Sequence, residues 1–177
     1  MKRRASLLSL PLAIVAAAWG GGLSCYDPVH DQEVAALGGE APGVSPGPTH
    51  RPGQPCNVCH GGVGPANVRF SVAGTVFQYS VAPSPPASGA TVQLQDSTGS
   101  SWHSTTNSAG NFYVLQSDWA PTYPLTVPGI VYNNVTQTMS TLDNREGSCA
   151  ACHTATPGTN SAGQVYINVG VAPGTGG

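Results

Sequence analysis

Apolar residues recur at every second position through much of the chain after about residue 67. A period of two is typical of strands that bury one face, and turn signals rich in Gly, Asn, Asp and Ser separate the runs at 84–89, 96–99 and 107–110. Short strands at near-regular spacing predict a mainly β fold, a β-sandwich. The alternating positions are Val68, Phe70, Val72 and Val76; Val92 and Leu94; Phe112 and Val114; Leu125 and Val127; and Val165, Ile167 and Val169.

The pattern at the N-terminus is of another kind. A basic start is followed by an apolar stretch over residues 7–18 and then by small residues, which is the layout of a secretory signal peptide. Residues 1–24 are therefore expected to direct export and to lie outside the folded domain. A single-pass membrane helix is the alternative, although the stretch is shorter than the ~20 residues that cross a bilayer and glycines at 20–22 end it.

Residues 25–55 show no periodic apolar positions and are rich in Gly and Pro. Such composition is typical of flexible linkers, so the sequence predicts a disordered tether before the β domain.

Charge is scarce, since only 8% of residues are charged. Beyond the leader the chain has no lysine and only three basic residues, Arg51, Arg69 and Arg145, against all eight acidic ones. Nucleic acid is therefore not an expected partner, and redox partner proteins would have to be met by shape or by an acidic surface.

The cysteines carry the chemistry. Two segments, CNVCH at 56–60 and CAACH at 149–153, are complete copies of the C-x-x-C-H haem-attachment motif and make the chain resemble a dihaem c-type cytochrome. In such proteins two thiols add to one porphyrin and the adjoining histidine binds the iron. The resemblance implies two covalently attached haem c groups. Their attachment residues would be Cys56, Cys59, Cys149 and Cys152, and their proximal ligands His60 and His153.

Two alternatives use the same thiols. Four thiolates suit a tetrahedral zinc site, and an exported protein also favours disulfides. Neither alternative explains why a histidine follows each second cysteine, in a chain with only 5 histidines.

Cys25 remains unpaired in this scheme. The segment ending Gly22-Leu23-Ser24-Cys25 resembles the lipobox of bacterial lipoproteins, in which the cysteine is acylated and becomes the mature N-terminus. This implies a lipid anchor at Cys25, with the protein held at the outer membrane on its periplasmic or cell-surface face. Cleavage after Ala18, leaving a free thiol, is the alternative.

Part of the β region carries a second resemblance. Gly74-Thr75-Val76, the 89–94 segment GATVQL, the 96–99 turn and the 106–112 segment TNSAGNF are similar to the carboxypeptidase regulatory-like, transthyretin-related β-sandwich. That resemblance implies an immunoglobulin-like or transthyretin-like fold and no activity. The expected organisation is a first haem-binding loop at 56–66 and a β-sandwich at 67–177 that contains the second loop at about 145–160, with both loops at its ends.

Each iron has a second axial position, and three residues are candidates for it. His50 precedes the first motif in a loop, and Met139 precedes the second. His103 follows Trp102 in a strand whose alternation turns Trp102 inward and His103 outward. A solvated histidine at 50 or 103 and a core methionine at 139 are the alternatives. His30 is expected to be solvated.

These features predict electron transfer by a membrane-tethered, exported dihaem cytochrome that is not an enzyme. Two other functions stay open. One is a dihaem enzyme with one open iron, similar to a peroxidase; the other is a structural or filament-forming display lipoprotein that self-assembles and uses its haems as a conduit.

Overall fold

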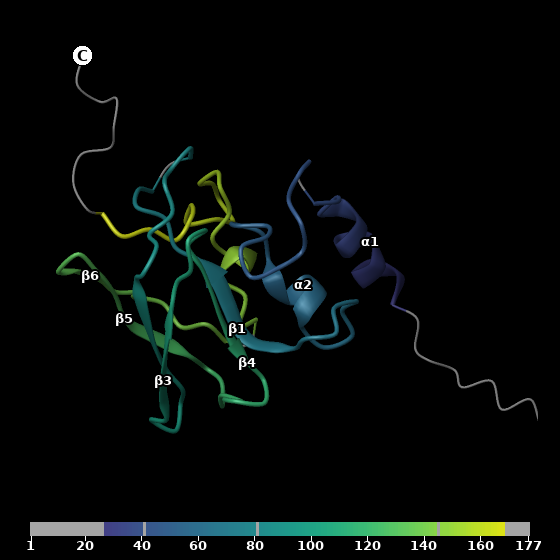
Figure 1. Ribbon diagram of the computed structural model, residues 1–177. Helices are drawn as coiled ribbons and strands as arrows, with labels where there is room; N and C mark the ends of the chain where they lie inside the picture. The colour runs from purple at the N-terminus through teal and green to yellow at the C-terminus, as the bar shows by residue number, and fades with distance from the viewer. Residues whose placement is uncertain (1–26, 41, 81, 145, 169–177) are drawn as a thin grey trace, which may run out of the picture.

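The computed structural model describes residues 27–40, 42–80, 82–144 and 146–168 (Figure 1). The expected signal peptide (residues 1–24), Cys25, Arg145 and Val169 therefore lie outside the described residues. Within the described ranges, no helix is both long and apolar enough to cross a membrane.

The fold is mainly β, with two antiparallel sheets and few helices, as the alternating pattern predicts. β1 (Phe70–Thr75) pairs with β4 (Asn111–Leu115), and the larger sheet has the order β3-β2-β5-β6. Its strands are β2 (Thr91–Gln95), β3 (Ser101–Thr105), β5 (Thr126–Tyr132) and β6 (Val135–Gln137). Together the sheets make a β-sandwich-like core.

The core consists of the apolar residues that alternate along the strands. In β2, for example, Val92 and Leu94 are buried whereas Gln93 between them is exposed. The expectation for β3 is also confirmed, because Trp102 is partly buried against the core and His103 is exposed. The buried apolar cluster is formed by Val72, Val76, Ala87, Ala90, Val92, Leu94, Phe112, Val114, Leu125, Ile130 and Ile167.

Two of the three expected turns close through glycines with positive φ. Gly99 (φ 86°) donates to the Asp96 carbonyl and Gly110 (φ 77°) donates to the Asn107 carbonyl. A side chain at either position would be strained, so the turn chemistry read from the sequence matches the backbone.

The C-terminal alternating run differs from the expected strand. Its described part makes a single parallel bridge, in which Tyr166 pairs with Phe77 just after β1. Ile167 is nevertheless fully buried in the core. Ser148 makes another parallel bridge to Ala73 of β1, so chain segments from the C-terminal part of the protein line the edge of β1 that β4 leaves open.

The expected tether differs from the structure in residues 27–40 and 42–55. A helix, α1 (Pro28–Ala36), begins at Asp27, whose side chain accepts hydrogen bonds from the Val29 and His30 amides. Pro28 fits the first helical turn, where no N–H is required. After α1, a hydrogen-bonded loop leads to the second helix, α2 (Cys56–His60). Figure 1 shows α1 and α2 together on one side of the molecule, with β6 on the opposite side.

Candidate haem-attachment site

The two C-x-x-C-H motifs, which are far apart in sequence, meet at β1. The first motif forms α2, and the second forms a short 3-10 helix, η1 (Cys149–Ala151); both pack against β1. The Asn57 side-chain amide of α2 donates to the carbonyl of Glu146, just before η1, at 3.2 Å. The two motifs therefore lie beside each other against β1.

Gly74 makes this approach possible. A Cβ atom at Gly74 would lie 2.8 Å from both Cβ and Sγ of Cys149, which is closer than real carbon atoms pack. The absence of a side chain in this part of β1 leaves the space that η1 occupies.

The first motif presents its three chemical groups on one face of α2. With 3.6 residues per turn, positions 56, 59 and 60 fall within an arc of about 100° around the helix axis. The ring nitrogen Nδ1 of His60 lies 2.9 Å from the carbonyl oxygen of Val68. Because a carbonyl only accepts hydrogen bonds, Nδ1 carries the proton, and Nε2 keeps the lone pair that a metal ion needs.

The loop after α2 is folded so that the carbonyl of Val68 lies beside His60. Arg69 donates to the Gly64 carbonyl at 2.8 Å and to the Cys59 carbonyl at 3.4 Å. Gly64 sits so close to the end of α2 that a Cβ there would overlap the Cys59 carbonyl oxygen. The glycines after the motif thus let the chain reverse and place Val68 beside His60.

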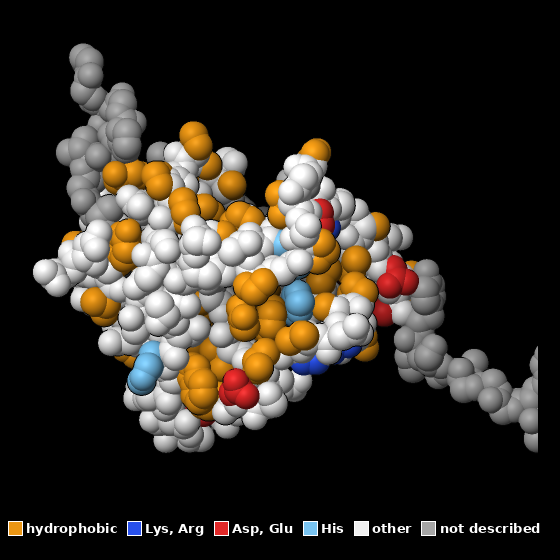
Figure 2. Space-filling view, viewed as in Figure 1, with side chains coloured by type: hydrophobic (Ala, Val, Ile, Leu, Met, Phe, Trp, Pro, Cys, Tyr) orange, Lys and Arg blue, Asp and Glu red, His pale blue; other side chains and the backbone are white. Residues whose placement is uncertain are grey.

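The His60 imidazole also forms part of a stack of aromatic rings. Its imidazole stacks on Phe70 of β1, with ring centroids 4.2 Å apart, and Phe70 stacks on Tyr113 of β4 at 4.7 Å. Tyr113 is 38% exposed, so the stack connects the His60 imidazole with the protein surface. Figure 2 shows hydrophobic side chains gathered around a histidine on the face of the molecule that carries α2.

The second motif repeats the hydrogen-bond arrangement of the first. Nδ1 of His153 lies 2.8 Å from the carbonyl oxygen of Gly163, so this imidazole also keeps a free Nε2. The Gly163 carbonyl is positioned by a loop that reverses the direction of the chain. In this loop the Ser161 hydroxyl accepts hydrogen bonds from the Thr154 and Gly163 amides. Gly163 has φ 80°, the left-handed region that favours glycine.

His50 is brought to the first motif. Its ring centroid lies 5.9 Å from that of His60, and the two ring planes are 81° apart. Nδ1 of His50 lies 3.0 Å from Oε1 of Glu40, so the proton is on Nδ1 and Nε2 is free for a metal.

Met139 and the second motif line the same groove. This groove has a volume of about 970 Å³ and is lined by Met139, Cys149, Cys152 and His153 among other residues. This volume is within the range of cofactor sites, and the groove reaches the core residues Leu94 and Phe112. The residues present therefore fit a haem c group held by Cys149, Cys152 and His153.

His103 is not brought to either motif. It lies on β3, exposed, opposite Gln93 of β2, in the sheet that does not contain β1. His30 is not fully solvated: it is partly buried, and it lines a cleft of about 460 Å³ behind the two motifs, beside Asn57 and Ser148. That cleft is lined by Asn57 and Val58 of α2, and not by Cys56, Cys59 or His60.

The four motif cysteines carry free thiols. Burial raises the pKa of Cys56 to about 11 and that of Cys149 to about 12, and the Cys56 thiol adds to the shift at Cys149. Neutral sulfur is thus favoured at both positions, as suits a thioether. Among the described residues, no group of three His, Cys, Asp or Glu side chains lies close enough together to hold a metal ion.

Sequence reasoning missed the residues that hold His50 in place. Asn111 of β4 donates to the His50 carbonyl at 2.9 Å and to the Pro48 carbonyl at 3.3 Å. Thr75 of β1 donates to Asn111 at 2.7 Å and accepts from the Gly53 amide at the same distance. In the sequence, Thr75 and Asn111 are visible only as polar residues within strand-like segments. This pattern does not indicate which loop contacts the two residues.

Searches of protein-family models, curated proteins and solved structures each found no match to this chain. The resemblances to dihaem c-type cytochromes and to the transthyretin-related sandwich therefore stay predictions.

Proposed function

We propose that this chain is an exported, lipid-tethered dihaem c-type cytochrome that transfers electrons between partner proteins. Cys56 and Cys59 would hold the first haem c, and Cys149 and Cys152 the second. His60 and His153 are the proximal ligands, with His50 and Met139 as the distal ones. The lipid on Cys25 would keep the protein at the outer membrane, on its periplasmic or cell-surface face.

One observation carries the proposal. Each motif histidine has Nδ1 tied to a backbone carbonyl, at 2.9 Å for His60 and 2.8 Å for His153, which leaves Nε2 as the metal-binding atom. Metal-ligating histidines typically have their second nitrogen fixed in this way. A redox or structural C-x-x-C pair would need no oriented histidine beside it.

The bound haems would supply reversible one-electron chemistry at iron. The protein's part is to fix each imidazole, to exclude water with apolar walls such as Phe70 and Leu94, and to hold both attachment motifs against one strand. The Asn57 link between the motifs favours direct electron exchange between the two haems.

Removal of each cysteine pair tests this proposal. The protein is produced with a cytochrome c maturation system and analysed by intact mass and by pyridine haemochrome absorbance. We expect two haems in the wild type and one in either double variant, Cys56→Ala/Cys59→Ala or Cys149→Ala/Cys152→Ala. The Cys25→Ala control should keep both haems and lose the acyl chains. Protein that folds without any bound haem would refute the proposal.

The groove beside His153 favours one second candidate, an enzyme whose second iron has an open position. This groove has a volume of about 970 Å³, and Met139 is the only one of the three candidate distal ligands that lines it. The two functions differ in their response to carbon monoxide. An electron carrier with six-coordinate irons leaves its ferrous spectrum unchanged, whereas an open iron gives a strong shift.

A further inference from the structure

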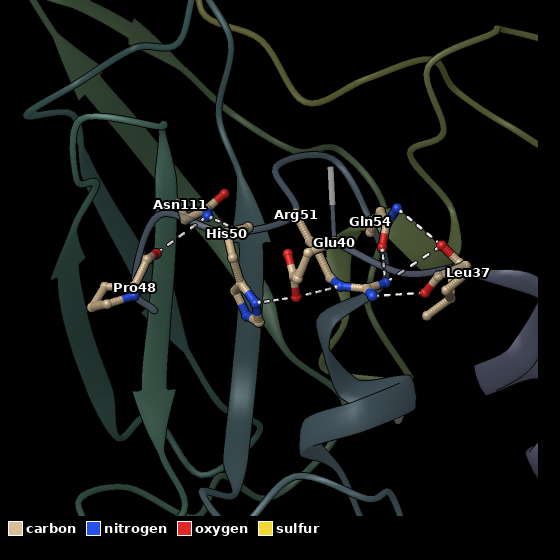
Figure 3. Close-up of polar contacts among 8 residues, drawn as sticks. Leu37, Glu40, Pro48, His50, Arg51, Gln54 and Asn111 are labelled. Carbon is tan, nitrogen blue, oxygen red and sulfur yellow. Dashed lines mark hydrogen bonds and ion pairs between the residues drawn. The ribbon is translucent and has the colours of Figure 1, made fainter. Parts of the chain in front are cut away.

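Glu40 joins two neighbouring residues of the loop that precedes the first motif. Its Oε1 atom lies 3.0 Å from Nδ1 of His50 and accepts a hydrogen bond from Nε of Arg51 at 2.8 Å (Figure 3). The three side chains are each between one fifth and about one quarter exposed, so the contact is partly shielded from water.

Arg51 holds the carboxylate where it is. Its guanidinium also donates to the carbonyls of Gly38, at 2.7 Å, and Leu37, at 3.4 Å, and to the Gln54 side chain at 3.0 Å (Figure 3). These bonds tie the end of α1 to the loop that contains His50. The Arg51 hydrogen bond also lowers the pKa of Glu40, so the carboxylate is ionised at neutral pH.

The backbone of His50 is held by a different residue. Asn111 donates to the His50 and Pro48 carbonyls (Figure 3). Asn107 also donates to the Pro48 carbonyl, so β4 and its turn position the loop itself. The contact between Glu40 and His50 therefore concerns the orientation of the imidazole and not the path of the chain.

Glu40 also distinguishes His50 from the two motif histidines. The Nδ1 atoms of His60 and His153 face neutral carbonyl oxygens, whereas Nδ1 of His50 faces a carboxylate. A carboxylate partner pulls the Nδ1 proton more strongly, which makes Nε2 a stronger electron donor and stabilises the oxidised metal.

We propose that Glu40 is a positioning residue that orients His50 toward the first haem iron and lowers the reduction potential of that iron relative to the second. This rests on the proposed function, because it requires a haem on the first motif. It adds to that function a direction of electron transfer between the two haems, because the second haem, with Met139 as its candidate ligand, would be reduced in preference to the first. Ligation by Met and His acts in the same sense, since it raises the potential of a haem.

The test is a spectroscopic redox titration of the Glu40→Gln holoprotein. Glutamine keeps the size and an acceptor oxygen but removes the charge. We expect the lower of the two potentials to rise and the higher one to stay, with both irons low-spin and altered g-values in the oxidised first haem. Asp31→Asn is the matched control, since it removes one carboxylate from exposed helix α1 without contact to His50 and should leave both potentials in place.

A purely structural role for Glu40 gives another result. In that case Glu40→Gln would lower the melting temperature and leave both potentials and the g-values unchanged, which would overturn the proposal. Haem content, measured on the same samples, separates this outcome from failure of the proposed function. With two haems present and potentials unmoved, only the role of Glu40 fails; without bound haem, the proposed function itself fails.

Discussion

At the scale of single residues, the informative feature of this protein is the partner of each histidine. Three imidazoles have Nδ1 tied to an oxygen that can only accept, namely Val68 O, Gly163 O and Oε1 of Glu40. Each therefore offers Nε2. His103 differs from these three histidines, because it is exposed on β3, an edge strand of the larger sheet. The neighbours of each histidine thus distinguish the candidate ligands His50, His60 and His153 from the surface residue His103.

His50→Ala should convert one of the two haems from low-spin to high-spin, because it removes the imidazole whose ring lies 5.9 Å from that of His60. Absorbance and electron paramagnetic resonance spectra of the oxidised protein would show the change in about half of the iron, with haem content unaltered. His103→Ala is the control and should reproduce the wild-type spectra. Unchanged spectra in both variants would exclude His50 as a ligand.

Met139→Leu should remove the sulfur-to-iron charge-transfer band from the near-infrared spectrum and lower the potential of the second haem, because Met/His ligation raises it. Leucine is close in volume to methionine, so the substitution alone costs less than about 1.5 kcal/mol of unfolding free energy. A wild-type spectrum without this band, together with an unchanged potential and a small loss of stability in the variant, would indicate a packing role for Met139.

At the scale of elements, the strands were accessible from the sequence and the site was only partly so. Val92 and Leu94 are buried and Gln93 is exposed because a period of two is a local property of a half-buried strand. The position of the motifs depends on what fills the open edge of β1, which is set by long-range packing. The sequence predicted haem-binding loops at the ends of the sandwich, but it did not indicate that Ser148 pairs with Ala73 along β1.

Helix α1 was missed for a related reason. It has no buried residue and so no amphipathic pattern, and it depends on the Asp27 cap and on the bonds of Arg51 to Leu37 and Gly38 beyond its end. Proline and glycine around it suggested a linker. Local capping and one arginine contact, instead of a hydrophobic face, order this part of the chain.

Gly74→Ala tests the packing of η1 on β1. The new methyl group would lie 2.8 Å from Cys149, and overpacking of this kind costs about 1–3 kcal/mol. We expect a lower melting temperature and reduced haem occupancy at the second motif, with the first motif filled. Gly129→Ala in β5 is the control, because its methyl group comes closest to the flexible end of Gln93, at 2.8 Å, which can move aside, and lies 3.2 Å from Cγ2 of Thr136. Equal effects of the two variants would contradict the special role of Gly74.

At the scale of the whole molecule, the balance of charge limits which partners the protein meets rapidly. Beyond the expected leader the chain has eight acidic residues, three basic ones and no lysine. Arg51 is paired with the Glu40 carboxylate, whereas Arg69 bonds to neutral carbonyls and keeps its charge, so acidic residues still outnumber basic ones. The charges left to act on an approaching partner are mainly negative, so long-range attraction favours partners with a positive surface.

This charge predicts how electron transfer depends on salt. Oxidation of the reduced protein by a small cationic complex such as hexaammineruthenium(III) should slow as ionic strength rises, because salt screens the attraction over a Debye length of about 8 Å at 0.15 M. Oxidation by anionic ferricyanide should become faster over the same range. Stopped-flow measurement at several salt concentrations gives both slopes. Opposite slopes would mean that a local basic surface around the haems, and not the net charge, governs encounter.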